Sequence, residues 1–340
     1  LYVGTSVSIR TRVRSYFTAS ESRRRMAEMV RIAESVTPVV CATSLEAHVR
    51  ELRLLAAHKP RYNRRSTRPE RVLWVKLTNE PFPRLSVVRA VSDDGARYVG
   101  PFTSRTAAME AVAAVHEVLP LRQCLSRLGP GSRRSPCALA ELGRCGAPCS
   151  GAQSVAEYAT IVDRAVDLLT GDCRPGVDAL RARMSDLALQ QRFEEAQVVR
   201  DRALALVRGA SRAQRLSPLA RTPELVAARR CPTSGGWEII TVRHGRLAGS
   251  TRSPRGADPI PYVEALRASA EVVAQPLAPA TAATPEESDT ILRWLEQPGV
   301  RIVDIDGQWT CPVGGAAAAR ATLEPLAVSA AHTPGFAHAG

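Results

Sequence analysis

The first 60 residues alternate short apolar runs with stretches of helical spacing, and this alternation restricts the fold more than any other feature. Residues 1–4 and 38–43 are apolar runs of strand length, which predict two buried strands. Residues 7–17, 22–34 and 44–58 carry apolar residues every three or four positions, which predicts three helices. We expect Ser44 to cap the third helix and Pro60 to end it, giving a small α/β unit.

The following segment, up to residue 118, has a β-rich pattern and then a helical one. Strands are predicted over 72–77, 85–91 and 96–99, and the turn Asp93-Asp94-Gly95 predicts that the last two form a hairpin. A helix is predicted over 104–118.

Four of the eight cysteines lie within 26 residues, separated by 12, 7 and 3 residues: Cys124, Cys137, Cys145 and Cys149. No secretion signal precedes them, so their bunching predicts metal or cluster binding in a reducing compartment rather than disulfides. Four thiolates suit zinc and an iron–sulfur cluster equally, although this spacing is not that of a zinc finger. The alternative is four unconnected buried thiols.

Helical spacing returns after the cysteines. A helix is predicted over 154–170, and two further helices with 3,4,3 apolar spacing are predicted to form an antiparallel hairpin that turns at 190–192. Such a hairpin either packs within its own domain or binds a partner hairpin. In the last third, His244-Gly245 and Asp306-Gly307 predict hairpin turns, and a helix is expected near 286–296.

Positive charge is concentrated in the first fifth of the chain. The net charge is +13, and residues 1–71 hold fifteen Arg and Lys against six Asp and Glu. This asymmetry predicts a nucleic-acid partner, and Arg10, Arg14, Lys59 and Arg61 are candidate DNA contacts. GC-rich coding would explain why Arg replaces Lys but not the clustering. No apolar run reaches the roughly 20 residues of a membrane span, so we expect a cytoplasmic protein without a membrane partner.

Arg12 and Glu51 are the candidate catalytic residues with the clearest local chemistry. Arg12 follows Ile9 by three positions and precedes Tyr16 by four, so it borders the apolar stripe, where a positioned guanidinium suits a phosphate oxygen. Glu51 lies on the predicted helix over 44–58 and could hold a divalent metal ion. The alternatives are a structural ion pair for Arg12 and a solvated side chain for Glu51.

The N-terminal segment resembles the GIY-YIG nuclease domain of the UvrC family. The matching pieces are Leu1-Tyr2-Val3-Gly4, Arg12-Val13-Arg14-Ser15-Tyr16, the helix from Leu45-Glu46-Ala47 to Glu51, and Lys59-Pro60-Arg61-Tyr62-Asn63. The resemblance implies an active site formed by Tyr2, Arg12, Tyr16, Glu51 and Asn63.

Roles for these five residues follow from the resemblance. It implies that Glu51 holds one Mg²⁺ or Mn²⁺ and that Arg12 neutralises charge developing on the scissile phosphate. It also implies that Tyr2 orients the water or the phosphate, and that Tyr16 and Asn63 contact the phosphate.

The sequence departs from the family pattern at two points. The first strand of the domain, with the motif's leading tyrosine, is absent, and Thr5 stands where a lysine is common. We therefore expect an N-terminally truncated nuclease, which could be inactive in this form.

Two later segments extend the resemblance to about residue 210. The cysteine segment implies a [4Fe–4S] cluster on Cys124, Cys137, Cys145 and Cys149, with zinc as the alternative. Residues 180–206 resemble the UVR motif, which implies that this hairpin binds a UvrB-like protein. The implied partner-binding residues are Phe193, Glu194, Ala196 and Val199.

The expected fold class is α+β with several domains. Its segments are a GIY-YIG domain at 1–65, a β-rich connector at 66–122, the cysteine segment at 123–152, a helical region with the UVR motif at 153–208, a linker at 209–223, a small α+β region of unknown role at 224–327 and a flexible tail at 328–340.

The function implied is that of a UvrC-like DNA endonuclease of nucleotide excision repair. It would hydrolyse one phosphodiester bond beside a lesion, on one side only, as in the short Cho-type members of the family. Two alternatives stay open: a non-catalytic adaptor that binds DNA and UvrB, and the DNA-targeting half of a larger nuclease.

Overall fold

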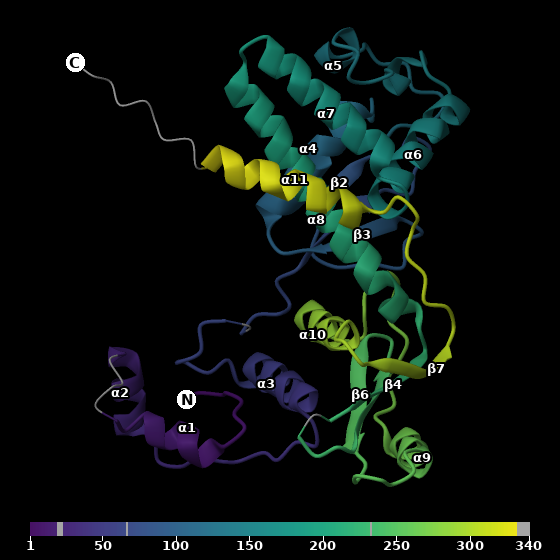
Figure 1. Ribbon diagram of the computed structural model, residues 1–340. Helices are drawn as coiled ribbons and strands as arrows, with labels where there is room; N and C mark the ends of the chain where they lie inside the picture. Colours follow the sequence, from purple (N-terminus) through teal and green to yellow (C-terminus); the bar gives the residue numbers. More distant parts are fainter. Residues whose placement is uncertain (19–22, 66, 232, 332–340) are drawn as a thin grey trace, which may run out of the picture. The chain divides into compact units, whose positions relative to one another are not determined.

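The computed structural model describes residues 1–18, 23–65, 67–231 and 233–331 (Figure 1). It divides into two compact units, of which unit 1 consists of Leu1–Glu70 and Leu219–Trp309, and unit 2 of Arg71–Pro218 and Thr310–Gly340. The N-terminal segment and most of the expected C-terminal region therefore share one unit. The α+β class is confirmed, with two separate antiparallel sheets. Within the described ranges, no helix is both long and apolar enough to cross a membrane.

The three helices predicted in the N-terminal segment are present in unit 1: α1 (Ile9–Ser15), α2 (Arg24–Ile32) and α3 (Ser44–His58). The N-cap of α3 is Thr43 and not Ser44, because the Thr43 hydroxyl accepts a hydrogen bond from the Glu46 N–H. Lys59 ends the helix in a left-handed conformation, one residue before Pro60.

The two strands predicted in this segment, at 1–4 and 38–43, are not formed. A strand is stabilised by a hydrogen-bonded neighbour, and none of the described strands pairs with either run. Residues 1–3 are held differently, since Leu1 O accepts from the Tyr62 N–H and Val3 bonds to the side chain of Asn63. The first half of the second run is exposed, and Val40 retains 91% of its accessible surface.

The sheet of unit 1 contains four antiparallel strands in the order β6-β5-β4-β7. They are β4 (Glu224–Arg230), β5 (Trp237–Arg243), β6 (Arg246–Arg252) and β7 (Arg301–Asp306). The hairpin predicted at His244-Gly245 is confirmed, and both residues have the positive φ that such a two-residue turn requires. The hairpin predicted at Asp306-Gly307 is wrong, because β7 pairs with β4 and no described strand follows it.

Helices cover both faces of this sheet. Ile239 packs with Leu266 of α9 (Ile260–Ser269), and its neighbour Ile240 points to the opposite face. Ser250 is the cross-strand partner of Ile240, and its hydroxyl lies 3.3 Å from that of Thr43. The start of α3 therefore lies on the face opposite α9. Helix α10 (Pro285–Leu295) packs against α3 and β6.

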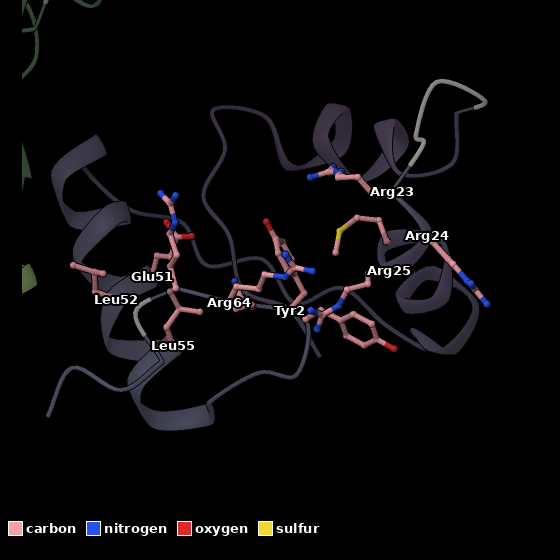
Figure 2. A pocket seen from close by; sticks show the side chains of 12 residues that line it. Tyr2, Arg23, Arg24, Arg25, Glu51, Leu52, Leu55 and Arg64 are labelled. Atoms are coloured by element: carbon pink, nitrogen blue, oxygen red, sulfur yellow. The ribbon is translucent and has the colours of Figure 1, made fainter. Parts of the chain in front are cut away.

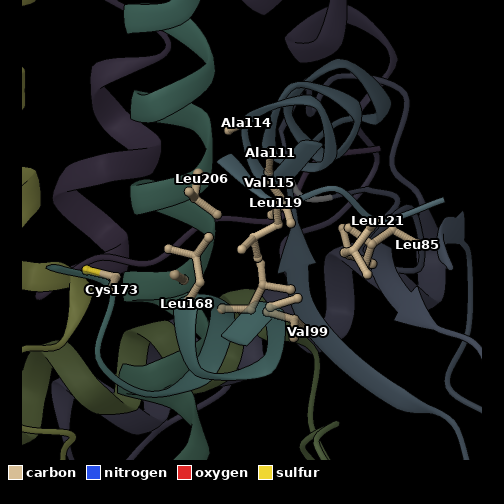
Figure 3. Packing of buried hydrophobic residues seen from close by; sticks show 14 of the residues in the cluster. Leu85, Val99, Ala111, Ala114, Val115, Leu119, Leu121, Leu168, Cys173 and Leu206 are labelled. Atoms are coloured by element: carbon tan, nitrogen blue, oxygen red, sulfur yellow. The ribbon is translucent and has the colours of Figure 1, made fainter. Parts of the chain in front are cut away.

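The sheet of unit 2 has β1 (Leu73–Leu77) between β2 (Leu85–Val88) and β3 (Arg97–Phe102). The predicted hairpin of β2 with β3 is wrong, because both strands pair with β1 on either side of it. Helix α4 (Arg105–Val118) packs on the sheet through small residues that include Ala111 and Ala114 (Figure 3).

The remaining helical elements of the described residues lie wholly or mostly in unit 2. They are α5 (Ala138–Glu141), the 3₁₀ turn η1 (Pro148–Ser150), α6 (Val155–Thr170), α7 (Arg174–Leu189), α8 (Phe193–Arg221) and α11 (Ala316–Ala331). The turn predicted between α7 and α8 is present, with Gln191 in the left-handed region. Apolar residues of both helices, such as Leu180 and Leu206, join the core of their own unit. The helical hairpin therefore packs within its own domain, which is one of the two alternatives that its apolar spacing allows.

Two expected irregular segments are helical. Residues 209–221 continue α8 and do not form a linker, because Ala210, Leu216 and Leu219 keep helical spacing and are buried. Residues 328–331 of the expected tail belong to α11, whereas 332–340 lie outside the described residues.

Candidate active site

Arg12 and Tyr16 are brought together by helix α1 itself. Ser8 caps the helix by accepting a hydrogen bond from the Thr11 N–H, and residues four apart then lie on one face. The Arg12 Nε donates to the Tyr16 hydroxyl at 3.2 Å and its Nη2 to the Tyr2 hydroxyl at 3.1 Å. The two tyrosine rings meet edge to face, with 6.1 Å between their centroids. The guanidinium of Arg12 is therefore held between two phenol oxygens.

Asn63 fixes the backbone next to Tyr2. Its Oδ1 accepts from the Val3 N–H at 2.9 Å and its Nδ2 donates to the Val3 carbonyl at 2.9 Å. The Asn63 amide thus satisfies both backbone polar groups of Val3, as a neighbouring strand would. In this arrangement Asn63 positions Tyr2, which differs from the direct phosphate contact that the resemblance implies.

Glu51 lies across a pocket of about 670 Å³ from this network. It lines the pocket together with Tyr2 and Asn63, and Figure 2 shows Glu51, Leu52 and Leu55 on the α3 side of the cavity. The Thr5 hydroxyl donates to Glu51 Oε2 at 3.2 Å. Three of the five residues implied by the resemblance therefore share one pocket. Arg12 is not a lining residue and reaches the pocket edge through Tyr2.

The pocket is also lined by arginines that sequence reasoning missed. Arg23, Arg24 and Arg25 come from the start of α2, and Arg64 and Arg65 follow Asn63 (Figure 2). The signal that could have identified them is the pair of arginine runs in the sequence. Among the described residues, no ion pair is formed by Arg24, Arg64 or Arg65.

The four predicted DNA contacts lie elsewhere, since none of them lines this pocket. Arg10 and Arg14 are exposed on α1. Lys59 forms an ion pair with Glu70 at 3.7 Å, and Arg61 one with Glu28 at 3.3 Å.

The donor set at Glu51 fits a hard divalent cation. The carboxylate is half-buried and, within the part of the chain that the structure describes, has no ion-pair partner. Glu51 contributes the carboxylate of the pocket lining, and no cluster of three or more His, Cys, Asp or Glu occurs among the described residues. Mg²⁺ keeps several of its waters and binds proteins through one or two carboxylates, which matches this site.

Protonation in the network is set by contact and burial. The pKa of Arg12 lies above its ordinary value, chiefly because of its hydrogen bond to Tyr2. Burial raises the pKa of Tyr16 above its ordinary value, and the neighbouring Tyr2 raises it further. At neutral pH Arg12 is therefore a cation and Tyr16 a neutral phenol that accepts a hydrogen bond from it.

The four bunched cysteines form a second candidate site. Burial raises the pKa of Cys145, and its electrostatic interactions with Cys124, Cys137 and Cys149 raise it further, so the other three side chains lie near Cys145. All are free thiols, and no set with metal-ligating geometry occurs among the described residues.

The fully buried Arg122 anchors the start of this segment. It forms an ion pair with Glu80 at 2.8 Å, and its Nη1 donates to the carbonyls of Cys124 and Ser126. The segment therefore begins at a fixed point of the unit 2 core.

The implied partner-binding residues are divided between surface and core. Phe193 keeps 64% of its surface and Glu194 is exposed, whereas Val199 is only 4% exposed and lies in the core of unit 2. Ala196 is intermediate. Across the turn, Leu189 keeps 84% of its surface.

Comparison with known proteins assigns families to two segments. Residues 1–64 match the model of the UvrC-like GIY-YIG domain, and residues 72–168 match that of the UvrC/Cho excinuclease middle domain. The second match includes the sheet of unit 2 and all four bunched cysteines. No solved structure matches the chain.

Curated relatives agree with these matches. A Mycobacterium tuberculosis protein, whose name describes a bifunctional exonuclease/endonuclease, is 43% identical over 307 residues, covering 90% of this chain and 47% of the relative. UvrABC system protein C of Geobacter metallireducens is 35% identical, covering 74% of this chain and 41% of its own length. The Thermus thermophilus counterpart is 34% identical, with 73% and 42% covered. The chain thus spans less than half the length of these relatives.

Proposed function

Because the chain belongs to the UvrC family, we propose that unit 1 carries a GIY-YIG nuclease site that hydrolyses a DNA phosphodiester bond in nucleotide excision repair. The observation that carries the proposal is the convergence of Tyr2, Glu51 and Asn63 on one pocket, with Arg12 held against Tyr2. In this reaction water adds to phosphorus and one P–O ester bond breaks, which leaves a phosphate end and a hydroxyl end.

The arginines of the pocket provide binding for the substrate backbone. Arg24, Arg64 and Arg65 line the cavity without ion-pair partners among the described residues, so their guanidinium groups are available to phosphate oxygens. We propose these residues, rather than Arg10 and Arg14 alone, as the contacts that bring the sugar-phosphate backbone to Glu51.

Tyr2 acts on the phosphate from inside the pocket, and Arg12 acts from the pocket edge. The Tyr2 hydroxyl accepts a hydrogen bond from Arg12, so its own O–H can donate a hydrogen bond to a phosphate oxygen. Since Arg12 is a fixed cation with further N–H groups, it can stabilise the negative charge that develops in the transition state. Tyr16 holds Arg12 in place as a neutral hydrogen-bond acceptor.

Glu51 would hold the divalent ion on which nucleases with a GIY-YIG domain depend, and either Mg²⁺ or Mn²⁺ suits a carboxylate ligand. When bound, such an ion supplies Lewis-acid stabilisation of charge on the phosphate. Thr5, which replaces the lysine common at this position, orients the Glu51 carboxylate through a hydrogen bond without neutralising it.

Glu51→Gln tests the nuclease proposal. The amide keeps the size of the side chain but loses the charge needed for the metal ion, so we expect nicking of a lesion-bearing duplex to fall at least ~100-fold with Mg²⁺ or Mn²⁺. DNA binding should stay within about twofold, because the arginines remain. The matched control is Glu34→Gln, which alters an exposed carboxylate of the same unit and should leave nicking unchanged.

Equal nicking by the wild-type chain and Glu51→Gln would contradict the metal role of Glu51. Tight DNA binding with no nicking by either protein would favour the non-catalytic adaptor.

We also propose that the turn ends of α7 and α8, within residues 180–206, bind a UvrB-like protein. The support is the exposure of Leu189 and Phe193 on either side of the turn, while the apolar stripe behind them is buried. Exposed aromatic residues of this kind often dominate the binding free energy of an interface.

Phe193→Ser is expected to weaken binding to the helical hairpin of a UvrB protein about tenfold or more, measured by calorimetry. Because Phe193 is exposed, the melting temperature should stay close to that of the wild-type chain. Met109→Ser, an exposed apolar change elsewhere in unit 2, is the control. Equal affinity of the Phe193→Ser and Met109→Ser variants would contradict the assignment of the α7–α8 turn as the UvrB-binding surface.

For the cysteine segment we propose a [4Fe–4S] cluster on Cys124, Cys137, Cys145 and Cys149, with zinc as the alternative. The shared neighbourhood of the four thiols and the family match of this segment support it. Four thiolates are the usual ligand set of such a cluster.

The chain purified without oxygen should therefore be brown, absorb near 400 nm and contain iron. We expect Cys145→Ser to lower the iron content severalfold, whereas Cys311→Ser, which changes an exposed cysteine outside the segment, should not. Stoichiometric zinc without iron would identify the alternative ion, and a metal-free protein would refute both.

A further inference from the structure

Two faces of helix α3 make different contacts. Glu51, Leu52 and Leu55 face the nuclease pocket. Glu46 and Arg53, which are seven positions apart and thus nearly in line on a helix, face β6 and α10 instead. The same helix therefore carries the proposed metal ligand on one side and rests on the C-terminal part of unit 1 with the other.

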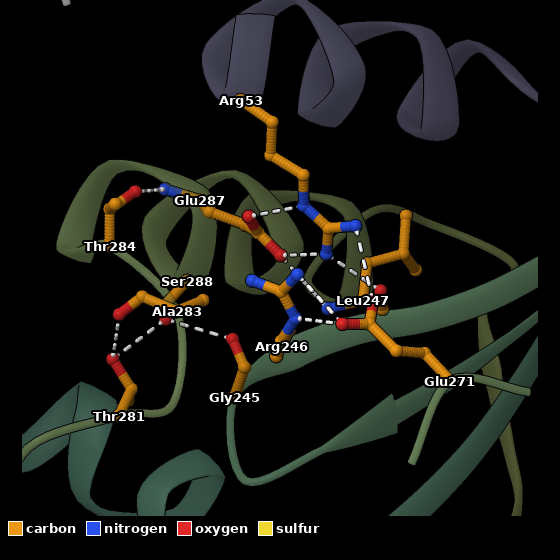
Figure 4. Close-up of polar contacts among 10 residues, drawn as sticks. All are labelled: Arg53, Gly245, Arg246, Leu247, Glu271, Thr281, Ala283, Thr284, Glu287 and Ser288. Carbon is orange, nitrogen blue, oxygen red and sulfur yellow. Dashed lines mark hydrogen bonds and ion pairs between the residues drawn. The ribbon is translucent and has the colours of Figure 1, made fainter. Parts of the chain in front are cut away.

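The contact on the second face centres on a bidentate ion pair. Arg53 Nε lies 3.0 Å from one oxygen of Glu287, and Nη2 lies 2.7 Å from the other (Figure 4). Glu287 is only 1% exposed, and its Oε1 also accepts from the Leu247 N–H. Arg53 donates to the Leu247 carbonyl at 2.8 Å and reaches Glu271 at 3.5 Å. All the partners of Arg53 in this contact therefore lie between residues 247 and 287.

A second contact fixes the start of the helix. The Ser250 hydroxyl donates to Glu46 Oε2 at 2.9 Å, and the same oxygen accepts from the Ala42 N–H. Burial acts to raise the pKa of Glu46, but these bonds and Arg50 outweigh it, and the pKa lies below its ordinary value. Glu46 is therefore a charged group with fixed donors at neutral pH.

The opposite wall of the pocket is held by other residues. Tyr2 is fixed by Arg12 and by the pairing of Val3 with Asn63, and within the described ranges no hydrogen bond or ion pair joins these residues to α10 or β6. The distance between Tyr2 and Glu51 thus depends on three attachments. Residues 1–3 are tied to 62–63, the Thr5 hydroxyl is bonded to Glu51 itself, and α3 is tied to the C-terminal part of unit 1.

We propose that Glu287 and Arg53 are positioning residues for Glu51, and that strands β4 to β7 with helices α9 and α10 form the platform that holds α3 in the place the reaction requires. The inference rests on the proposed function, because it concerns the metal ligand of that site. It gives a role to the region that the sequence left without one. A shift of about 1 Å in a catalytic group can cost about 100-fold in rate.

The test compares Glu287→Gln with Glu264→Gln, a matched change at an exposed position of the same platform, in the full chain. Mn²⁺ binding is measured by the electron paramagnetic resonance signal of the free ion. The Glu51→Gln variant defines the part of the binding that belongs to Glu51. We expect Glu287→Gln to weaken that binding about tenfold and to slow single-turnover nicking ~10–100-fold, with unchanged affinity for DNA. Glu264→Gln should match the wild-type chain.

Two further variants separate positioning from folding. Arg53→Lys keeps the charge but loses the two-point contact, so it should give an intermediate loss even if Glu287→Gln fails to fold. The exchange Arg53→Glu with Glu287→Arg should recover part of the lost Mn²⁺ affinity. Wild-type Mn²⁺ affinity and nicking rate in a folded Glu287→Gln or Arg53→Lys protein would overturn the proposal.

Amide hydrogen exchange tests whether the platform holds α3, even if Glu51 does not bind the metal ion. Should Glu51→Gln bind Mn²⁺ like the wild-type chain, the proposed metal site is wrong. The platform is then tested by the amides of residues 44–58, which exchange faster in Glu287→Gln if it holds α3. Unchanged exchange there would refute the platform by itself.

Discussion

A carboxylate as fully buried as that of Glu287 is stable only beside a cation and hydrogen-bond donors, and Arg53 and the Leu247 N–H provide both. The two side chains are 234 positions apart in the sequence. Their pairing makes one unit of the N-terminal helices and the C-terminal sheet. Removing either partner would leave a charge without compensation, so the pair restricts where α3 can lie.

The remainder of the site is built from short-range contacts. Arg12 and Tyr16 are one helical turn apart, and the Asn63 side chain pairs with the backbone of Val3 in place of a strand. These contacts place Tyr2 and Arg12 together. Glu51 joins them because α3 carries it to the same pocket, where the Thr5 hydroxyl meets it. The pocket therefore combines a local motif with a long-range attachment.

This division explains what the sequence could predict. The helices α1 to α3 follow from apolar periodicity, and the tyrosines, arginine and glutamate of the site follow from motif resemblance. The strands at 1–4 and 38–43 were predicted wrongly, because composition favours a strand but only a hydrogen-bonded neighbour forms one. The turn before β3 was recognised but joined to the wrong strand, since turn residues do not reveal that β1 lies between β2 and β3. The Arg53–Glu287 pair has no local signal, because the adjacent Glu286 and Glu287 in the first turn of α10 are what an exposed helix start ordinarily carries.

Diffraction from crystals of the chain soaked in Mn²⁺, recorded at a wavelength where manganese scatters anomalously, would locate the metal ion of the proposed nuclease site. We expect an anomalous peak against the Glu51 carboxylate, inside the pocket that Tyr2 and Asn63 also line, with Arg12 still bonded to Tyr2. A peak confined to other carboxylates, or Arg12 and Glu51 facing separate surfaces with no pocket between them, would contradict it.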